Sequence, residues 1–135
     1  MFHVDHYAIS VKDADKSIDF YKKLNFSLVK DYRAEDGSVR IVHMTNGGFI
    51  LEMFCYPNSD ELPEFVKSLN TDLMVKGSKH MGLWVESLEE ASDYLQKNGL
   101  LEEKPVISQG RLGRAYFFIK DPDGIFVEII AKQKS

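Results

Sequence analysis

The sequence has little cysteine, no long apolar run and no excess of basic charge. Its one cysteine, Cys55, has no second cysteine with which to form an internal disulfide. No stretch approaches the roughly 20 apolar residues that a membrane-spanning helix needs. The N-terminus also lacks the basic start and apolar core of a secretory signal. These absences predict a cytoplasmic protein that has no membrane partner.

The balance of charge argues against nucleic acid as a partner. The net charge is -4, and acidic and basic residues are interspersed, so no positive surface is expected for a phosphate backbone. The length of 135 residues and the 44% hydrophobic content are typical of one globular domain. Such a domain can bury enough surface to fold without a disulfide or a structural metal. We therefore expect a single domain, residues 1–135, whose partner is a small molecule.

Each half of the chain predicts the same order of elements. An alternating strand is followed by an amphipathic helix, which Asp13 can cap in the first half and which ends near Asn25. Three extended segments follow in each half, and Asn46-Gly47-Gly48 predicts a hairpin between two of them. The predicted strands and helices cover residues 3–11, 13–25, 26–34, 38–45 and 49–57, and then 80–87, 88–99, 102–108, 114–120 and 125–132.

The two halves align as a repeat. A shift of 74 residues places His6 on His80, and a shift of 76 residues places Glu52 on Glu128. The prediction is an α+β fold of two βαβββ modules: module 1 (1–56), a linker (57–79) and module 2 (80–135). The linker could form a short helix after Pro63, and it is either a lid over a site or a plain connection.

The repeated histidine and glutamate positions point to a metal. Alone, a strand histidine or glutamate is more often a surface or hydrogen-bonded residue than a ligand. Glu52 and Glu128, however, lie inside apolar runs, where a carboxylate without a counter-charge would be costly. Imidazoles and carboxylates together suit a divalent first-row ion. We therefore predict one divalent metal ion (Ni, Zn, Co, Mn or Fe), and no other cofactor, held by His6, Glu52, His80 and Glu128.

The alternation of side chains along strands predicts which residues line the same pocket. Ser10 shares a face with His6, and Phe54 and Tyr56 share a face with Glu52. His43 would face Glu52 if the hairpin pairs in simple register, but one β-bulge would reverse it. Trp84 shares a face with His80, where it is either a pocket wall or ordinary core. The substrate-pocket candidates are Ser10, His43, Phe54, Tyr56 and Trp84.

Four stretches carry a family resemblance: DHYAISVKDADKSIDFY, GGFILEMF, KHMGLWVESLEEA and AYFFIKDPDGIFVEII. With them the chain resembles the vicinal oxygen chelate superfamily, which includes glyoxalase I, bleomycin resistance proteins and extradiol dioxygenases. The resemblance implies curved mixed sheets around a metal site. It also implies that the first-strand histidine and last-strand glutamate of each module are the metal ligands, which are His6, Glu52, His80 and Glu128 here.

The resemblance further implies a glyoxalase I-like lyase or isomerase that acts on a small vicinal-oxygen substrate. Glu128 and Glu52 would be catalytic, with Glu128 moving a proton beside a metal-bound carbonyl. The alternative is a small-molecule binding or resistance protein on the same scaffold. Ser10 and Tyr56 stand where bacterial glyoxalase I has an arginine and an asparagine, so the use of glutathione stays open. A homodimer is expected, and the two modules that form one site come either from one chain or from the two chains of the dimer, because such modules can pair either way.

Overall fold

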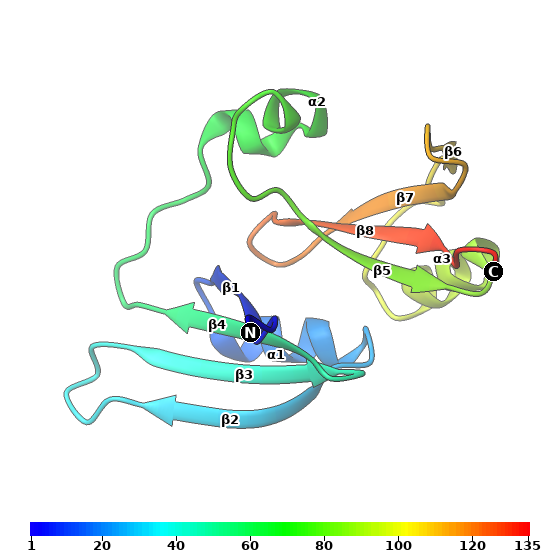
Figure 1. The fold of residues 1–135 in the computed structure, drawn as a ribbon. Helices are drawn as coiled ribbons and strands as arrows, with labels where there is room; N and C mark the ends of the chain where they lie inside the picture. Colours follow the sequence, from blue (N-terminus) through cyan, green and yellow to red (C-terminus); the bar gives the residue numbers. More distant parts are fainter. The chain divides into compact units, whose positions relative to one another are not determined.

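In a computed structural model that describes residues 1–135, each half of the chain folds as a strand, a helix and three further strands (Figure 1). The chain divides into two compact units, Met1–Glu61 and Leu62–Ser135. Unit 1 contains β1 (His6–Ser10), α1 (Ala14–Lys22), β2 (Ser27–Arg33), β3 (Arg40–Asn46) and β4 (Phe49–Cys55). Unit 2 contains the 3-10 helix η1 (Glu64–Lys67), α2 (Leu69–Leu73), β5 (Met81–Val85), α3 (Leu88–Lys97), β6 (Ser108–Gln109), β7 (Ala115–Lys120) and β8 (Phe126–Ala131).

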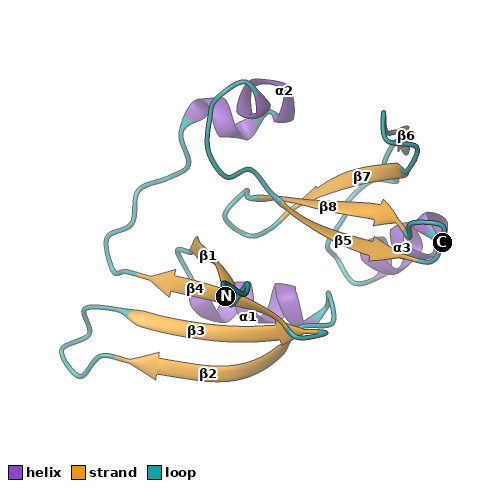
Figure 2. Ribbon diagram, viewed as in Figure 1, coloured by secondary structure: helices purple, strands orange, loops and turns teal.

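Each unit contains one four-stranded mixed sheet (Figure 2). The strand order is β1-β4-β3-β2 in unit 1 and β5-β8-β7-β6 in unit 2. In both sheets the first strand runs parallel to the last, and the other neighbours are antiparallel. The predicted α+β class with two βαβββ modules is confirmed.

The two long helices begin at the residues that their capping chemistry favours. The Asp13 side chain accepts a hydrogen bond from the backbone N–H of Lys16 at 3.2 Å, and Ser87 accepts one from Glu90 at 3.2 Å. Each bond satisfies a backbone donor that the helix itself leaves unpaired. Just beyond α1, Asn25 takes a φ of 67°, a left-handed conformation typical of a helix exit. The predicted start of α1 at Asp13 is confirmed, whereas the helix ends at Lys22, three residues before the predicted exit at Asn25.

One face of each sheet packs on the helix of its own unit. In unit 1, Val42, Met44, Leu51 and Met53 are at most 1% exposed, and Tyr21 of α1 is buried with them. In unit 2 the buried side chains include Leu95, Phe117, Ile119, Val127 and Ile129. Since neighbouring residues of a strand point to opposite faces, burial of these side chains puts Glu52 and Glu128 on the other face of their sheets.

The hairpin between β3 and β4 has an unbroken register. Asn46 pairs with Phe49 across a two-residue turn, and the pairing continues residue by residue to Arg40 with Cys55. Gly47 and Gly48 have φ values of 55° and 85°, which is the left-handed backbone that such a turn requires. Because no bulge interrupts the pairing of β3 with β4, His43 lies on the same face as its partner Glu52.

One local prediction was wrong. Of the extended segment predicted at 102–108 only Ser108 joins the edge strand β6, because only Ser108 and Gln109 pair with β7. The short helix predicted after Pro63 is present as η1, and α2 follows it after Ser68, which has an extended backbone (φ -120°, ψ 133°). No helix in the structure is both long and apolar enough to cross a bilayer.

Arg40 ties three elements of unit 1 together. Its guanidinium donates two hydrogen bonds to Asp31 of β2, at 2.9 and 2.8 Å, and one to Asp15 of α1, at 2.9 Å. The bond to Arg40 is the main reason that the pKa of Asp31 is lowered. A carboxyl group with a lowered folded-state pKa stabilises the fold above its unfolded pKa, and this contribution disappears as the pH falls through the folded value.

Replacing Arg40 with glutamine should therefore lower the free energy of unfolding at pH 7 by about 1 kcal/mol, as expected for a partly exposed bidentate pair. The difference from wild type should shrink as the pH falls below about 4, because the unfolded chain then binds a proton at Asp31 that the folded wild type, with its lowered pKa, binds only at lower pH. Urea unfolding at several pH values measures this. A difference that stays constant down to pH 3 would contradict the assigned cause.

Candidate metal centre

In unit 1, the parallel pairing of β1 with β4 brings His6 close to Glu52. Ala8 is the direct partner of Glu52, and His6 lies two residues earlier on the same face. The His6 Nε2 atom is 3.4 Å from Glu52 Oε1. The Glu52 side chain is only 16% exposed, so its carboxylate is largely removed from bulk water.

Asp5 orients the His6 ring. The Nδ1–H of His6 donates a hydrogen bond to Asp5 Oδ2 at 2.6 Å. This bond raises the pKa of His6, burial opposes the rise, and the nearby Glu52 charge adds to it. In the neutral ring, Nε2 keeps its lone pair and faces the Glu52 oxygen. Two lone pairs this close repel each other unless a proton or a cation lies between them, as at an ion-binding position.

His43 contacts the second oxygen of the same carboxylate. It is the register partner of Glu52, and its Nε2 atom lies 2.5 Å from Glu52 Oε2. The rings of His6 and His43 are 6.1 Å apart between centroids and inclined by 28°. The two oxygens of Glu52 therefore face two different imidazoles.

In unit 2, His80 and Glu128 repeat the first contact. His80 lies just before β5, and its Nε2 atom is 3.1 Å from Glu128 Oε2. Gly82 is the direct partner of Glu128, and a Cβ atom at this glycine would lie 3.9 Å from Glu128 Oε2. The glycine thus leaves open space over the carboxylate. The Nδ1 atom of His80 is buried and has no hydrogen-bond partner.

The donor chemistry at these positions fits a divalent cation. Each unit presents an imidazole nitrogen beside a carboxylate oxygen, which is the mixed set that first-row ions accept. Neither unit by itself contains a group of three or more His, Cys, Asp or Glu side chains arranged to hold a metal ion.

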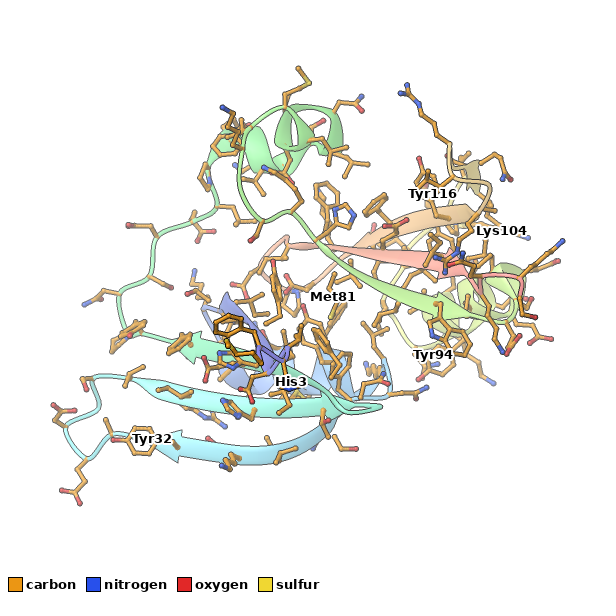
Figure 3. The ribbon with its side chains drawn as sticks, viewed as in Figure 1. His3, Tyr32, Met81, Tyr94, Lys104 and Tyr116 are labelled. Atoms are coloured by element: carbon orange, nitrogen blue, oxygen red, sulfur yellow. The ribbon has the colours of Figure 1, made fainter.

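Sequence reasoning did not single out Asp5, although it directly precedes a histidine. A carboxylate beside a candidate ligand histidine is the available signal, since such histidines commonly donate their other ring N–H to a carboxylate. His3, by contrast, lies before β1 and is exposed (Figure 3).

The pocket candidates fall on exposed or half-exposed positions. Ser10 is exposed and pairs with Phe54. The rings of Phe54 and Tyr56 are stacked, with centroids 6.5 Å apart and planes inclined by 9°. Trp84 is 58% exposed, which excludes the core alternative for this residue within its unit. Lys132 Nζ lies 4.9 Å from the centre of the Trp84 ring, within cation–π range.

The chain contains two βαβββ modules. Each has a histidine beside a carboxylate on the sheet face opposite its helix. These features define a class of α+β proteins. Within this class the family is shown by sequence. Residues 3–129 match the family model of the Glyoxalase/Bleomycin resistance protein/Dioxygenase superfamily, and the chain belongs to that superfamily.

Individual relatives cover nearly the whole chain. The uncharacterized protein YwkD of Bacillus subtilis is 30% identical over 128 residues, which are 93% of this chain and 94% of YwkD. The crystal structure of a glyoxalase family protein from Enterococcus faecalis superposes with a TM-score of 0.78 at 23% identity, covering 95% of this chain and 96% of that one. The trypanothione-dependent glyoxalase I of Leishmania major superposes at 0.69 with 20% identity, covering 97% and 87%. These structures share the fold.

Proposed function

We propose that this protein is a metal-dependent lyase or isomerase that acts on a small vicinal-oxygen substrate by proton transfer beside a carbonyl. His6 and Glu52 of unit 1 and His80 and Glu128 of unit 2 are the proposed ligands of one divalent ion. The two units that share an ion come from one chain or from the two chains of a homodimer.

The observation that carries the proposal is the repeated histidine–carboxylate contact. At repeat-equivalent positions, Glu52 lies 3.4 Å from His6, and Glu128 lies 3.1 Å from His80. All four side chains are at least partly shielded from water, with exposures of 38% for His6 and 20% or less for the other three. Partly buried carboxylates on an open sheet face need a counter-charge. Membership of the superfamily supports the choice of a metal for that role.

The chain's own residues would move the proton. A bound divalent ion would polarise a substrate carbonyl and stabilise the negative charge that develops on its oxygen. Glu128 is the proposed base: it takes the proton from the carbon beside the carbonyl and returns it to the neighbouring carbon. Gly82 supports this role, because the space over Glu128 lets a substrate carbon approach the carboxylate. Asp5 holds His6 in the orientation that keeps Nε2 available.

A binding protein without catalysis is the second candidate. The exposed Trp84 ring and the stacked pair of Phe54 and Tyr56 offer aromatic surfaces to which a planar ligand could bind. The superfamily includes bleomycin resistance proteins by name. The two functions differ in proton transfer: an isomerase exchanges a substrate C–H with deuterium in D₂O, whereas a binding protein does not.

The direct test of the proposal is metal content. Protein purified without chelator should contain a divalent ion, and metal-free protein should take up one equivalent of Ni, Co, Zn, Mn or Fe per set of four ligands. Elemental analysis and calorimetry measure this. If none of the five ions binds above the level seen with an unrelated protein, the proposed function is wrong.

The single tryptophan allows a second measurement, on the surroundings of Trp84. It lies four residues after His80, which corresponds to roughly 13 Å along a strand. Adding Ni or Co to metal-free protein should quench its fluorescence and reach a plateau at one equivalent, whereas diamagnetic Zn should quench it much less. Unchanged emission during confirmed metal uptake would exclude Trp84 from the surroundings of the ion.

A further inference from the structure

The two halves of the protein differ at the position opposite each glutamate. In unit 1 the register partner of Glu52 is His43, and in unit 2 the partner of Glu128 is Phe118. The aromatic residue cannot donate a hydrogen bond to the carboxylate. Its ring instead packs edge-on against His80, with centroids 4.8 Å apart and planes at 90°. The repeat is therefore broken at this pair of positions.

Glu52 is consequently held more firmly than Glu128. Its Oε2 accepts the Nε2–H of His43 at 2.5 Å, which leaves Oε1 turned toward His6 Nε2. The Glu128 carboxylate is contacted by His80 at one oxygen, and β7 presents no donor opposite it. A carboxylate whose second oxygen is fixed loses much of its rotational freedom, as is required of a permanent ligand.

We propose that His43 is a positioning residue, which holds Glu52 in the orientation that a metal ligand needs. It donates Nε2–H to Oε2, so that Oε1 is presented beside His6 Nε2. Glu52 then stays a ligand, and Glu128, which lacks such a partner, is the carboxylate free to carry a proton. This inference rests on the proposed function and adds a residue that only the first half possesses.

His43 is suited to this role by its position in the fold. It is in the middle of β3, and neighbouring Val42 and Met44 are completely buried, so its backbone is fixed by the core. Its side chain is 23% exposed and points to the open face of the sheet. Substitution there should change the contact to Glu52 without opening a cavity in the core.

Two variants distinguish the effect of the His43 hydrogen bond from the effect of side-chain size. H43F copies the residue that the second half has at the equivalent position, and H43Q keeps an N–H donor. Calorimetric titration of the metal-free proteins with Co or Zn should show a 10- to 100-fold lower affinity in H43F, as for other residues that orient a ligand. H43Q should recover most of the wild-type affinity. H3F, at an exposed histidine before β1, is the matched control and should bind like wild type.

A readout without metal tests the contact itself. In metal-free wild type, NMR of the imidazole nitrogens should show His43 protonated at Nε2. The resonance of this Nε2–H proton should lie downfield and should move upfield in E52Q. Thermal unfolding of the metal-free variants should show similar midpoints, which distinguishes positioning of Glu52 from a general structural role.

The outcomes are distinguishable. Wild-type protein that takes up no metal overturns the proposed function and this inference with it. Wild-type protein that binds one equivalent, together with an H43F variant of equal affinity, overturns the inference alone. Equal losses in H43F and H43Q would also overturn it, because a role in positioning Glu52 by a donated hydrogen bond requires rescue by the donor.

Discussion

Replacing Glu52 and Glu128 together with glutamine should abolish specific metal binding. Each substitution removes a negative charge and leaves an amide oxygen, which is a much weaker donor to a divalent ion. The dissociation constant for Co or Ni should rise by more than about a hundredfold, beyond the effect of losing a residue that only orients a ligand. Calorimetry and metal content after dialysis measure the change.

The matched control replaces Glu35 and Glu103 with glutamine. These residues are exposed and lie one in each unit, so the control changes the net charge equally. It should bind metal like wild type. If the E52Q/E128Q protein folds and retains one tightly bound equivalent, the four-ligand assignment fails. Since both carboxylates lie on the sheet faces opposite the buried core side chains, the variant should remain folded, which circular dichroism can verify.

Glu128→Gln alone should separate catalysis from metal binding. Under saturating metal, kcat should fall by about 10²–10⁴-fold, the usual loss when a general base is removed. Solvent deuterium should no longer enter the substrate. Suitable substrates for the assay are small α-oxo aldehydes, free and as adducts with a panel of thiols, and 2-hydroxy ketones.

The matched comparison for this prediction is Glu52→Gln. Because His43 holds Glu52 in place as a ligand, the loss of Glu52 should appear mainly as weaker metal binding, with kcat largely recovered at saturating metal. If the two single variants lose kcat equally at saturating metal, the assignment of Glu128 as the base is wrong. If wild type turns over none of the compounds but binds one of them, the binding-protein alternative is favoured.

Much of the fold could be predicted from the sequence because it depends on local interactions. The cap at Asp13, the exit at Asn25 and the turn at Gly47-Gly48 depend on residues within a few positions of one another, and each was predicted. The alternation that buries Leu51 and Met53 also places Glu52 on the opposite face, because the side-chain period of a strand is fixed. The segment at 102–108 was misjudged, because an edge strand depends on a neighbour as well as on its own composition.

The two βαβββ modules and the repeated positions of His6 with Glu52 and His80 with Glu128 could be predicted from residue order alone. The side chains that support these residues are set by the packing of the strands. The contact of His43 with Glu52 depends on an unbroken register between two strands, which one inserted residue would have reversed. The exposure of Trp84 likewise depends on what packs against its face of β5. Periodicity assigns a side chain to a face of a strand, but its partners come from neighbouring strands, and strand pairing is a long-range property of the chain.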